Sequence, residues 1–227
     1  MDFTGHWQPG SVFRAMQEVA GAQCAGYGLS YSDMSQNGLA WVLTRACVRM
    51  DRYPVYGEPV EILTWPTASR HTFFPRHFAF MAGGEQVGLA TALYVVFDLN
   101  ERKIAPSSRL PHEVPVCERP APLPMPGAVR RLDAPSENAV YTPAYHDADM
   151  NGHVNNTRYV DWFCDRFACA KHRKQELCEL LVNYNLETRP DEPLTLALQS
   201  EGNISVMHGL RDGASCFAIE GKGEDRK

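Results

Sequence analysis

A proline-rich segment in the middle of the chain divides it into two parts. Seven prolines lie between Pro106 and Pro126. Proline fixes the backbone angle φ and has no amide hydrogen to donate, so neither a regular helix nor a central strand is expected here. We therefore expect residues 109–130 to form a linker between an N-terminal domain, residues 1–108, and a C-terminal domain, residues 131–227. A chain of 227 residues, 44% of them hydrophobic, is long enough for two small domains or one large domain.

The part before the linker has the pattern of one helix followed by several strands. Ser11 is a candidate helix cap, and apolar residues follow it at the i, i+3, i+4 and i+7 spacing of a buried helical face, namely Val12, Ala15, Met16 and Val19. Strand-like runs follow at 39–50, 60–66, 73–81 and 86–98, with a hairpin turn at 82–85. This order predicts an α+β unit with an antiparallel sheet.

The part after the linker repeats this order. A strand is predicted at 138–145, and after it a helix whose apolar residues are Val160, Phe163, Cys164 and Phe167. Further strands are predicted at 178–188, 194–201 and 216–220. In both halves a bend containing proline ends in Glu-Pro and an apolar residue, at 53–62 and at 189–196. We interpret this as an internal duplication, which predicts two similar α+β units packed side by side.

Composition argues against several classes of protein. The formal net charge of −5 gives no indication of nucleic-acid binding, and no run approaches the roughly 18 apolar residues of a membrane span. The first residues lack the basic start and the apolar stretch of a signal peptide. Seven cysteines without a C-x-x-C pair fit reduced thiols better than disulfides or zinc ligands. We expect a cytoplasmic protein without a cofactor or metal ion.

The segment 145–156, YHDADMNGHVNN, is rich in acid, amide and imidazole groups just before the second predicted helix. Three of them stand at alternate positions: Asp149, Asn151 and His153. Residues 147–152 match the opening of a calcium loop, but the twelfth position needs a bidentate glutamate and holds Arg158. Calcium binding is therefore not expected.

Turn and helix-cap chemistry is the structural alternative for this segment. Asp and Asn are common where a strand turns into a helix, and Asn155 or Asn156 is a candidate cap. A cap uses one or two side chains and leaves the alternating trio unexplained. Such groups of acid, amide and imidazole are also common in functional sites. From these residues alone, both interpretations stay open.

Residues 147–162, DADMNGHVNNTRYVDW, resemble the D-x-N-x-H-V-N-N-x-x-Y-x-x-W signature of the acyl-acyl-carrier-protein thioesterases. Residues 37–69 resemble an N-terminal segment of the same family, with W-V-x-T-R, D-R-Y-P and T-W in the same order. The similarity extends from about residue 9 to about residue 202. It implies a double hot-dog fold, two tandem domains in which a curved antiparallel sheet wraps a long helix, and hydrolysis of fatty acyl-acyl-carrier-protein.

The resemblance also implies which residues are catalytic. In the family the Asp, Asn and His of the motif act in catalysis, and these are Asp149, Asn151 and His153. A further glutamate, on the strand after the helix, falls on Glu187. Thioester hydrolysis needs an activated water, donors toward the developing oxyanion and a proton for the departing thiol.

Each residue then has an expected role. Glu187 and Asp149 hold or deprotonate the water. Asn151 orients the carbonyl or the water, and His153 supports charge transfer or protonates the leaving group. Backbone amides at the start of the helix after Val154 are further candidate oxyanion donors.

Many family members place a cysteine after this glutamate, where this chain has Thr188. A threonine hydroxyl without a dedicated base is a poor nucleophile. We therefore expect attack by water rather than an acyl-enzyme at this position. The cysteines elsewhere are expected to be packing residues.

The first unit offers no recognisable counterpart of the loop, because the entry to its helix has His6 but no Asp and Asn pair. The resemblance implies that this unit holds the acyl chain. Apolar residues that are candidates to line a tunnel are Met16, Val19 and Trp41. Ordinary burial in the core is the simpler explanation of these three.

The resemblance implies an acyl carrier protein as the partner. Such carriers are strongly acidic, so a basic patch near the tunnel mouth is expected. The candidates are Arg70, Arg76, Arg130, Arg131, Arg158, Arg173 and Lys174. Two other functions stay open, an acyl-CoA thioesterase of the hot-dog fold and a non-catalytic acyl-binding protein. No nucleic-acid or membrane partner is expected, and a homodimer is compatible with the sequence.

Overall fold

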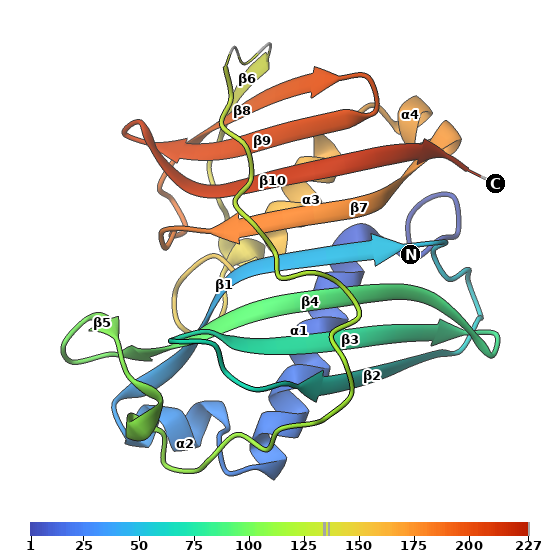
Figure 1. The fold of residues 1–227 in the computed structure, drawn as a ribbon. Helices are drawn as coiled ribbons and strands as arrows, with labels where there is room; N and C mark the ends of the chain where they lie inside the picture. Colours follow the sequence, from blue (N-terminus) through green and yellow to red (C-terminus); the bar gives the residue numbers. More distant parts are fainter. Residues whose placement is uncertain (134, 136, 227) are drawn as a thin grey trace.

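The computed structural model describes residues 1–133, 135 and 137–226, and its central feature is one antiparallel sheet (Figure 1). The strands lie in the order β2-β3-β4-β1-β7-β10-β9-β8-β6, with β5 paired to β4. Their bounds are β1 Leu39–Met50, β2 Val60–Pro66, β3 Phe74–Ala82, β4 Glu85–Asp98, β5 Lys103–Ile104, β6 Glu137–Tyr141, β7 Gln175–Tyr184, β8 Leu194–Glu201, β9 Ile204–Arg211 and β10 Ala214–Asp225. The helices are α1 Pro9–Gly26, α2 Tyr31–Gln36, α3 Arg158–Asp165 and α4 Cys169–Lys174, with short 3₁₀ helices η1 Ser107–Arg109 and η2 Tyr145–Asp147. No helix in this described part is long and apolar enough to cross a membrane.

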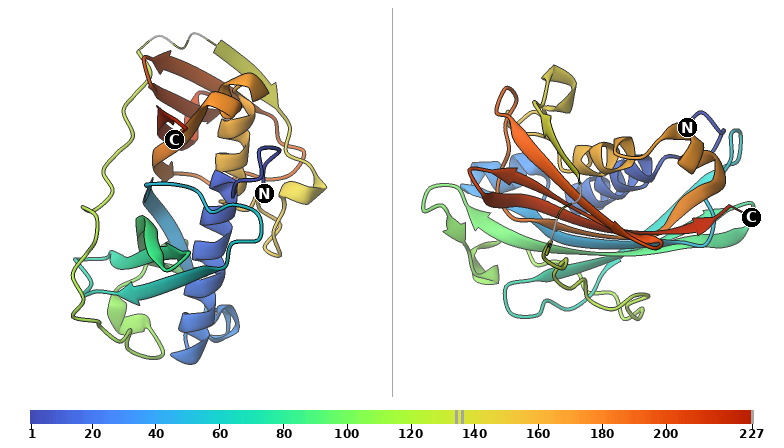
Figure 2. Two further views of the ribbon diagram at one scale, coloured as in Figure 1. Left: turned by 90° about the vertical axis from the view of Figure 1, so that its right-hand side faces the viewer. Right: turned by 90° about the horizontal axis from the view of Figure 1, so that it is seen from above.

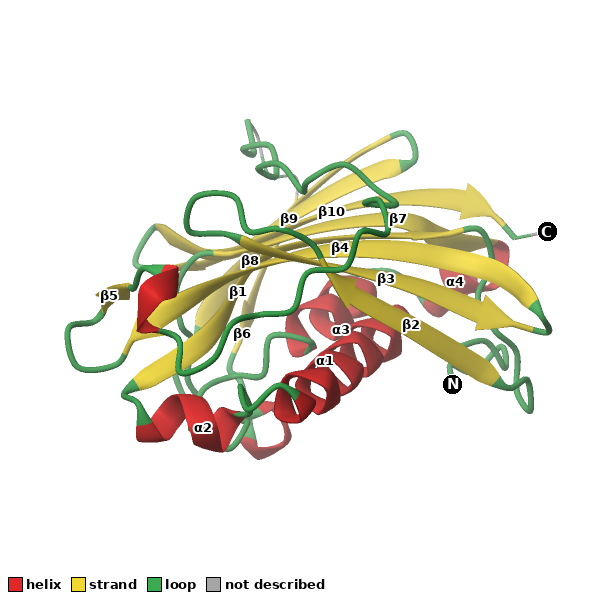
Figure 3. Ribbon diagram, turned by 60° about the horizontal axis from the view of Figure 1, so that its bottom comes forward, coloured by secondary structure: helices red, strands yellow, loops and turns green. Residues whose placement is uncertain are grey.

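The two halves are joined edge to edge through β1 and β7. These antiparallel neighbours pair from Arg45 with Asn183 to Arg49 with Glu179, so the strands of both halves form one curved surface. Figure 2 shows α1 and α3 on the same face of this surface, while the chain between the halves crosses the other face. The view in Figure 3 separates these two layers. The predicted pair of α+β units, side by side, is therefore confirmed.

Helix α1 begins at Pro9, because a residue in the first turn has no use for the amide hydrogen that proline lacks. The predicted cap at Ser11 is wrong, since Gln8 flanks the helix and no side chain caps it. The predicted apolar stripe largely faces the sheet. The buried residues of this helix are Gly10, Val12, Phe13, Met16 and Ala20.

The second half differs from its prediction in the length of several elements. Helix α3 ends at Asp165, so Phe167 lies beyond the helix, where its ring packs edge-on against Phe163. Strand β9 was not predicted, because Gly209 interrupts its apolar run. A side chain at position 209 would collide with the ring of Phe217, which accounts for the glycine. The prediction of one long helix in the second unit is wrong, because the chain forms two short helices there, α3 and α4.

The segment between the halves is bound to the sheet. The side-chain amide of Asn183 accepts from the backbone of Val129 at 2.7 Å and donates to the carbonyl of Gly127 at 3.1 Å. Further along, the guanidinium of Arg119 lies 4.2 Å from the ring centroid of Trp65, a cation–π contact. These bonds hold the segment against β7 and β2 as a strap across the outer face.

A buried histidine in the first half makes the stability of the fold depend on pH. His77 on β3 is fully buried, and its two ring nitrogens contact the hydroxyls of Thr91 at 2.9 Å and Thr67 at 3.0 Å. Burial, together with the neighbouring charge of Arg76, lowers the pKa of His77 to about 4. The neutral imidazole is therefore the form that the fold accommodates.

We expect the free energy of unfolding to fall as the pH drops from about 6.5 toward 4, since in that window the unfolded chain protonates His77 and the folded chain does not. Between pH 7 and pH 5 the loss from this group is about 2 kcal/mol. Urea unfolding at both pH values measures it. The His77→Gln variant keeps a hydrogen-bonding side chain and should lose less stability than the wild type; an equal loss in both proteins would contradict this account.

Candidate active site

The loop before α3 is closed by its own backbone. The amide of Asp149 donates to the carbonyl of His153 at 2.8 Å, and the amide of Gly152 donates to the carbonyl of Asp149 at 3.1 Å. Gly152 has a φ of +72°, in the left-handed region where glycine has no steric penalty. This turn fixes the spacing between Asp149 and His153.

Asp149 and Asn151 form one pair within the loop. One carboxylate oxygen of Asp149 accepts from the backbone amide of Asn151 at 2.8 Å, and the other accepts from its side-chain amide at 3.4 Å. The side-chain amide of Asn151 keeps a second hydrogen and a carbonyl oxygen for other contacts. Because Asn151 is exposed, these groups are accessible to a ligand.

Glu187 joins the loop from the segment after β7. The backbone amide of Val154 donates to the carbonyl of Thr188 at 2.8 Å, which aligns the two segments. The Nε2 atom of His153 then lies 3.4 Å from Oε2 of Glu187. The side chains of His153 and Glu187 are 28% and 54% exposed, so the pair is open to solvent. All four predicted residues therefore gather at this loop as two contacting pairs, Asp149 with Asn151 and His153 with Glu187.

A buried pair of hydroxyls holds Thr188, the residue next to Glu187. The Oγ1 atom of Thr188 lies 2.7 Å from the hydroxyl of Tyr159, and Thr188 is fully buried. The ring of Tyr159 stacks on Phe217 at 4.1 Å, and burial raises the pKa of Tyr159 to about 12. The hydroxyl of Thr188 is thus buried and already hydrogen-bonded, which fits a positioning role better than nucleophilic attack.

Sequence reasoning missed Asp147, which anchors the start of the loop. Its carboxylate is buried, and it accepts from the amide of Ala144 at 2.8 Å, the hydroxyl of Tyr141 at 3.0 Å and the indole of Trp162 at 3.3 Å. The sequence did carry a signal for this role, because Asp147 is the third residue after Ala144, the position at which an acidic side chain caps the start of a helix.

Within the described part of the chain, no group of three or more His, Cys, Asp or Glu side chains could hold a metal ion.

The first unit contributes to this region through α1. Arg14 donates to the carboxylate of Asp161 on α3 at 2.8 Å, and Arg158 donates to the same carboxylate at 3.3 Å. Arg158 also donates to the carbonyl of His146 at 2.6 Å. A side chain on Gly10 would collide with Asp161, so the glycine permits this close approach of the two helices.

Most of the backbone amides expected as oxyanion donors are already used. The amide of Val154 is bonded to Thr188, that of Asn155 to the carbonyl of Asp147 at 2.8 Å, and that of Thr157 to the side chain of Asn155 at 3.0 Å. The expected helix-start oxyanion site is therefore wrong for these groups. The predicted helix cap at Asn155 or Asn156 is wrong, because Thr157 flanks α3 and no side chain caps the helix. The side chain of Asn155 instead accepts from the hydroxyl of Thr157 as well as from its amide.

The first unit does contain a counterpart of the loop, contrary to the expectation from sequence. The amide of Asp2 donates to the carbonyl of His6 at 2.7 Å, and Gly5, with a φ of +82°, donates to the carbonyl of Asp2 at 3.1 Å. The carboxylate of Asp2 accepts from the amide of Thr4 at 2.7 Å, as Asp149 does from Asn151. The letters DFTGHW at 2–7 and DMNGHV at 149–154 carry the signal, with threonine in place of asparagine.

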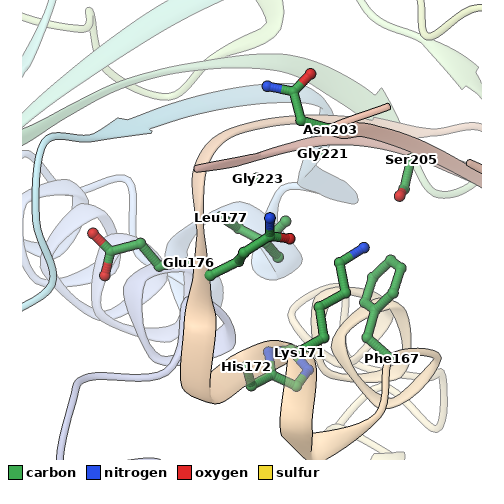
Figure 4. Close-up of a pocket in the computed structure, with 10 residues that line it drawn as sticks. Phe167, Lys171, His172, Glu176, Leu177, Asn203, Ser205, Gly221 and Gly223 are labelled. Atoms are coloured by element: carbon green, nitrogen blue, oxygen red, sulfur yellow. The ribbon is translucent and has the colours of Figure 1, made fainter. Parts of the chain in front are cut away.

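Two shallow clefts lie at the other end of β7 and are not lined by any of the four predicted residues. Figure 4 shows the first, between α4 and the start of β7. The candidate tunnel residues are packed in the core, since Met16 is buried, Val19 packs beside it, and Trp41 meets Phe74 edge-on at 5.1 Å. The packing explanation of these three is therefore the one that the contacts support.

Comparison with known proteins identifies the family. A model of the acyl-ACP thioesterase N-terminal domain matches residues 1–114, and a model of the acyl-ACP thioesterase C-terminal domain matches residues 131–221. The chain belongs to the acyl-ACP thioesterase family. The resemblance seen in the sequence motifs is therefore confirmed.

Curated members of the acyl-ACP thioesterase family are similar over most of this chain. An acyl-acyl-carrier-protein hydrolase of Cuphea viscosissima is 29% identical over 224 residues, which cover 88% of this chain and 53% of the relative. A dodecanoyl-acyl-carrier-protein hydrolase of Cinnamomum camphora is 28% identical over 79% of this chain and 49% of the relative. The chain thus spans about half the length of the curated relatives that it matches.

Solved structures of the acyl-ACP thioesterase family share the fold. One from Bacteroides thetaiotaomicron superimposes with a TM-score of 0.90 at 23% identity, covering 99% of this chain and 93% of that chain. The 12:0-ACP thioesterase from Umbellularia californica gives 0.83 at 21% identity, covering 100% and 93%. The α+β tandem hot-dog fold expected from the sequence is therefore confirmed.

We expect Asp147→Asn to lower the free energy of unfolding by about 1–3 kcal/mol, because the amide turns a donor toward groups that are themselves donors. Urea unfolding measures the change. The matched control is Asp51→Asn, whose carboxylate is exposed beside Arg49 at 3.6 Å and should cost about 0–0.5 kcal/mol. Equal costs in the two variants would contradict the anchoring role of Asp147.

Proposed function

We propose that this protein hydrolyses the thioester of fatty acyl-acyl-carrier-protein and releases the free fatty acid. The observation that carries the proposal is the 3.4 Å approach of His153 to Glu187 beside the Asp149–Asn151 pair. Membership of the acyl-ACP thioesterase family and the hydrolase names of the curated relatives support it.

The proposed reaction is direct attack by water. Glu187 holds the water and accepts its proton as the oxygen bonds to the thioester carbonyl carbon. The amide of Asn151, oriented by Asp149, donates to the carbonyl oxygen as negative charge develops there. When the tetrahedral intermediate collapses, the carbon–sulfur bond breaks. His153 then gives a proton to the departing thiolate and recovers one from Glu187, which it contacts.

This assignment uses what each group can do with a proton. A carboxylate such as Glu187 can accept one from water, whereas an imidazole such as His153 can donate one from one ring nitrogen and accept one at the other. The buried pair formed by Thr188 and Tyr159 holds the glutamate segment without entering the chemistry.

We propose residues 1–108 as the acyl-binding domain, 109–130 as the linker and 131–227 as the catalytic domain. The family models end and begin close to these limits, at 114 and at 131, which supports the division.

A cytoplasmic location is proposed as well, supported by the seven cysteines, all of which are free thiols.

The proposed partner is an acyl carrier protein bearing a fatty acyl chain. Not every candidate cation is suited to docking, because Arg76 is buried and Arg158 is bound to Asp161. Arg130 is shared between Glu220 at 3.4 Å and Glu201 at 3.9 Å. Arg173 on α4 is exposed, with its guanidinium 4.9 Å from the ring centroid of Phe3.

His153→Ala and Glu187→Gln should each lower kcat on a medium-chain acyl-carrier substrate by about 10²–10⁴-fold, the usual contribution of a general acid or base. Asn151→Ala should lower it by about 10²–10³-fold. The matched control is His6→Ala, which removes the same side chain from the loop of the first unit and should leave turnover unchanged. Near-normal turnover by the folded His153→Ala protein would contradict the proposed active site.

The salt dependence of kcat/KM tests whether the substrate is carried by an acidic protein. We expect added salt to reduce kcat/KM on acyl-carrier substrate much more than on a small thioester, because it screens the attraction of an acidic partner. Matched acyl-CoA and acyl-carrier substrates should also differ in rate. Faster hydrolysis of acyl-CoA would favour the acyl-CoA alternative, and fatty-acid release from neither would favour a silent binding protein.

A further inference from the structure

Arg158, the first residue of α3, holds the segment that leads into the proposed active-site loop. Its Nη2 atom donates to the carbonyl of His146 at 2.6 Å, and its Nε atom lies 4.0 Å from the buried carboxylate of Asp147. Its Nη1 atom donates to the carboxylate of Asp161 at 3.3 Å. A guanidinium carries its donors in a rigid planar fork, so one side chain can hold these three groups at fixed positions.

The backbone of Arg158 is attached to the other end of the same loop. Its amide donates to the carbonyl of Asn155 at 2.9 Å, and the amide of Asn155 donates to the carbonyl of Asp147 at 2.8 Å. The residue therefore contacts the loop where it begins, at 146–147, and where it ends, at Asn155. Replacing the side chain would release the beginning of the loop and leave these backbone bonds in place.

The orientation of Arg158 depends in turn on the first unit. Helices α1 and α3 lie on the same face of the sheet (Figure 2), and the carboxylate of Asp161 accepts from Arg14 of α1 at 2.8 Å as well as from Arg158. One carboxylate thus lies between two guanidinium groups that come from different units. Gly10 permits this arrangement, because a side chain there would collide with Asp161.

Stability alone is a weak reason for these contacts. The side chains of Arg14, Arg158 and Asp161 are 37%, 31% and 24% exposed, and ion pairs between partly exposed groups add little to the stability of a fold. The contacts do form an unbroken path from α1 through Asp161 and Arg158 to the carbonyl of His146. Their position at the start of the loop points to a role in its geometry.

We propose that Arg158 is a positioning residue for thioester hydrolysis, oriented from the first unit by Arg14 through Asp161. It acts by fixing the loop that carries the Asp149–Asn151 pair and makes no contact with the reacting atoms. This role rests on the proposed function, because the loop is the site of that reaction.

We expect Arg158→Gln to lower kcat on acyl-carrier substrate by about 10–100-fold and to change KM by less than about twofold, since a shift of about 1 Å in a catalytic group can cost about 10²-fold in rate. Arg158→Lys keeps the charge and should recover part of the loss. The matched control is Arg52→Gln, whose guanidinium joins Glu58 at 2.6 Å to the carbonyl of Ala82 at 3.3 Å in the first unit. Its kcat should equal that of the wild type. Equal losses of kcat in the two glutamine variants, or a change confined to KM, would reject the inference.

A double-mutant cycle shows whether Arg158 acts through the loop. In an Asn151→Ala background, Arg158→Gln should lower kcat by a smaller factor than it does in the wild type, because the group that it positions is already gone. Losses that multiply in the double variant would mean that Arg158 acts independently of Asn151, contrary to the inference.

Gly10→Ala tests the contribution of the first unit without a change in charge. The added methyl group displaces the carboxylate of Asp161 and with it the partner of Arg158. We expect kcat to fall, by less than in Arg158→Gln, and to fall no further when Gly10→Ala is added to Arg158→Gln. The matched control is Gly21→Ala, also on α1, where a methyl group meets no described atom within 4 Å apart from its neighbours along the helix. Equal kcat in the two alanine variants would reject the part assigned to the first unit.

Hydrogen exchange tests the positioning role without a substrate. The amides of Asp149 and Asn155 bond to the carbonyls of His153 and Asp147 within the loop. Arg158→Gln should raise their exchange rates at least about tenfold, because local opening of the loop becomes easier. Faster exchange together with an absence of hydrolysis by the wild type would retain the positioning of the loop and reject the proposed function. Hydrolysis by the wild type, with unchanged kcat and unchanged exchange in Arg158→Gln, would do the reverse.

Discussion

The pairing of β1 with β7 is the constraint on which the rest of the structure depends. It joins two antiparallel half-sheets into one curved surface, from Arg45 beside Asn183 to Arg49 beside Glu179. Because the sheet is continuous, α1 and α3 cover the same face of both half-sheets. The two helices meet at Gly10, where the absence of a side chain leaves room for Asp161. The strap must then cross the opposite face, which a proline-rich segment without its own hydrogen-bonding pattern can do.

The same loop is used twice in this frame with different outcomes. Backbone bonds, a left-handed glycine and an aspartate that accepts from residue i+2 recur around Asp2 and Asp149. The difference arises from the segment opposite, to which each loop bonds through one backbone amide. The residue before the accepting carbonyl is a solvent-exposed carboxylate, Glu187, in one unit and a buried phenol, Tyr53, in the other. Local geometry is therefore shared, whereas the chemistry is decided by a residue far away in sequence.

Sequence patterns predicted the parts of this protein that depend on local periodicity or on a spaced motif. The apolar stripe of α1 and the strands of the first half belong to this class. The grouping of the loop with Glu187 was implied only by the resemblance to the thioesterase family. Several other features depend on tertiary contacts and left no local signal. Strand β9 is interrupted by a glycine that only the ring of Phe217 explains, and α3 stops at Asp165 where a continuous helix was expected. The loop at Asp2 did leave a signal, DFTGHW at 2–7 beside DMNGHV at 149–154, but threonine in place of the asparagine obscured it.

The central claim is that His153 and Glu187 act as one unit in thioester hydrolysis, and a double-mutant cycle on kcat/KM tests it most directly. Residues that share one proton transfer are strongly non-additive, so the second substitution has little left to remove. The account predicts that His153→Ala combined with Glu187→Gln is no slower on acyl-carrier substrate than the worse single variant. Fold losses that simply multiply in the double variant would contradict it, because they would mean that the two side chains act independently.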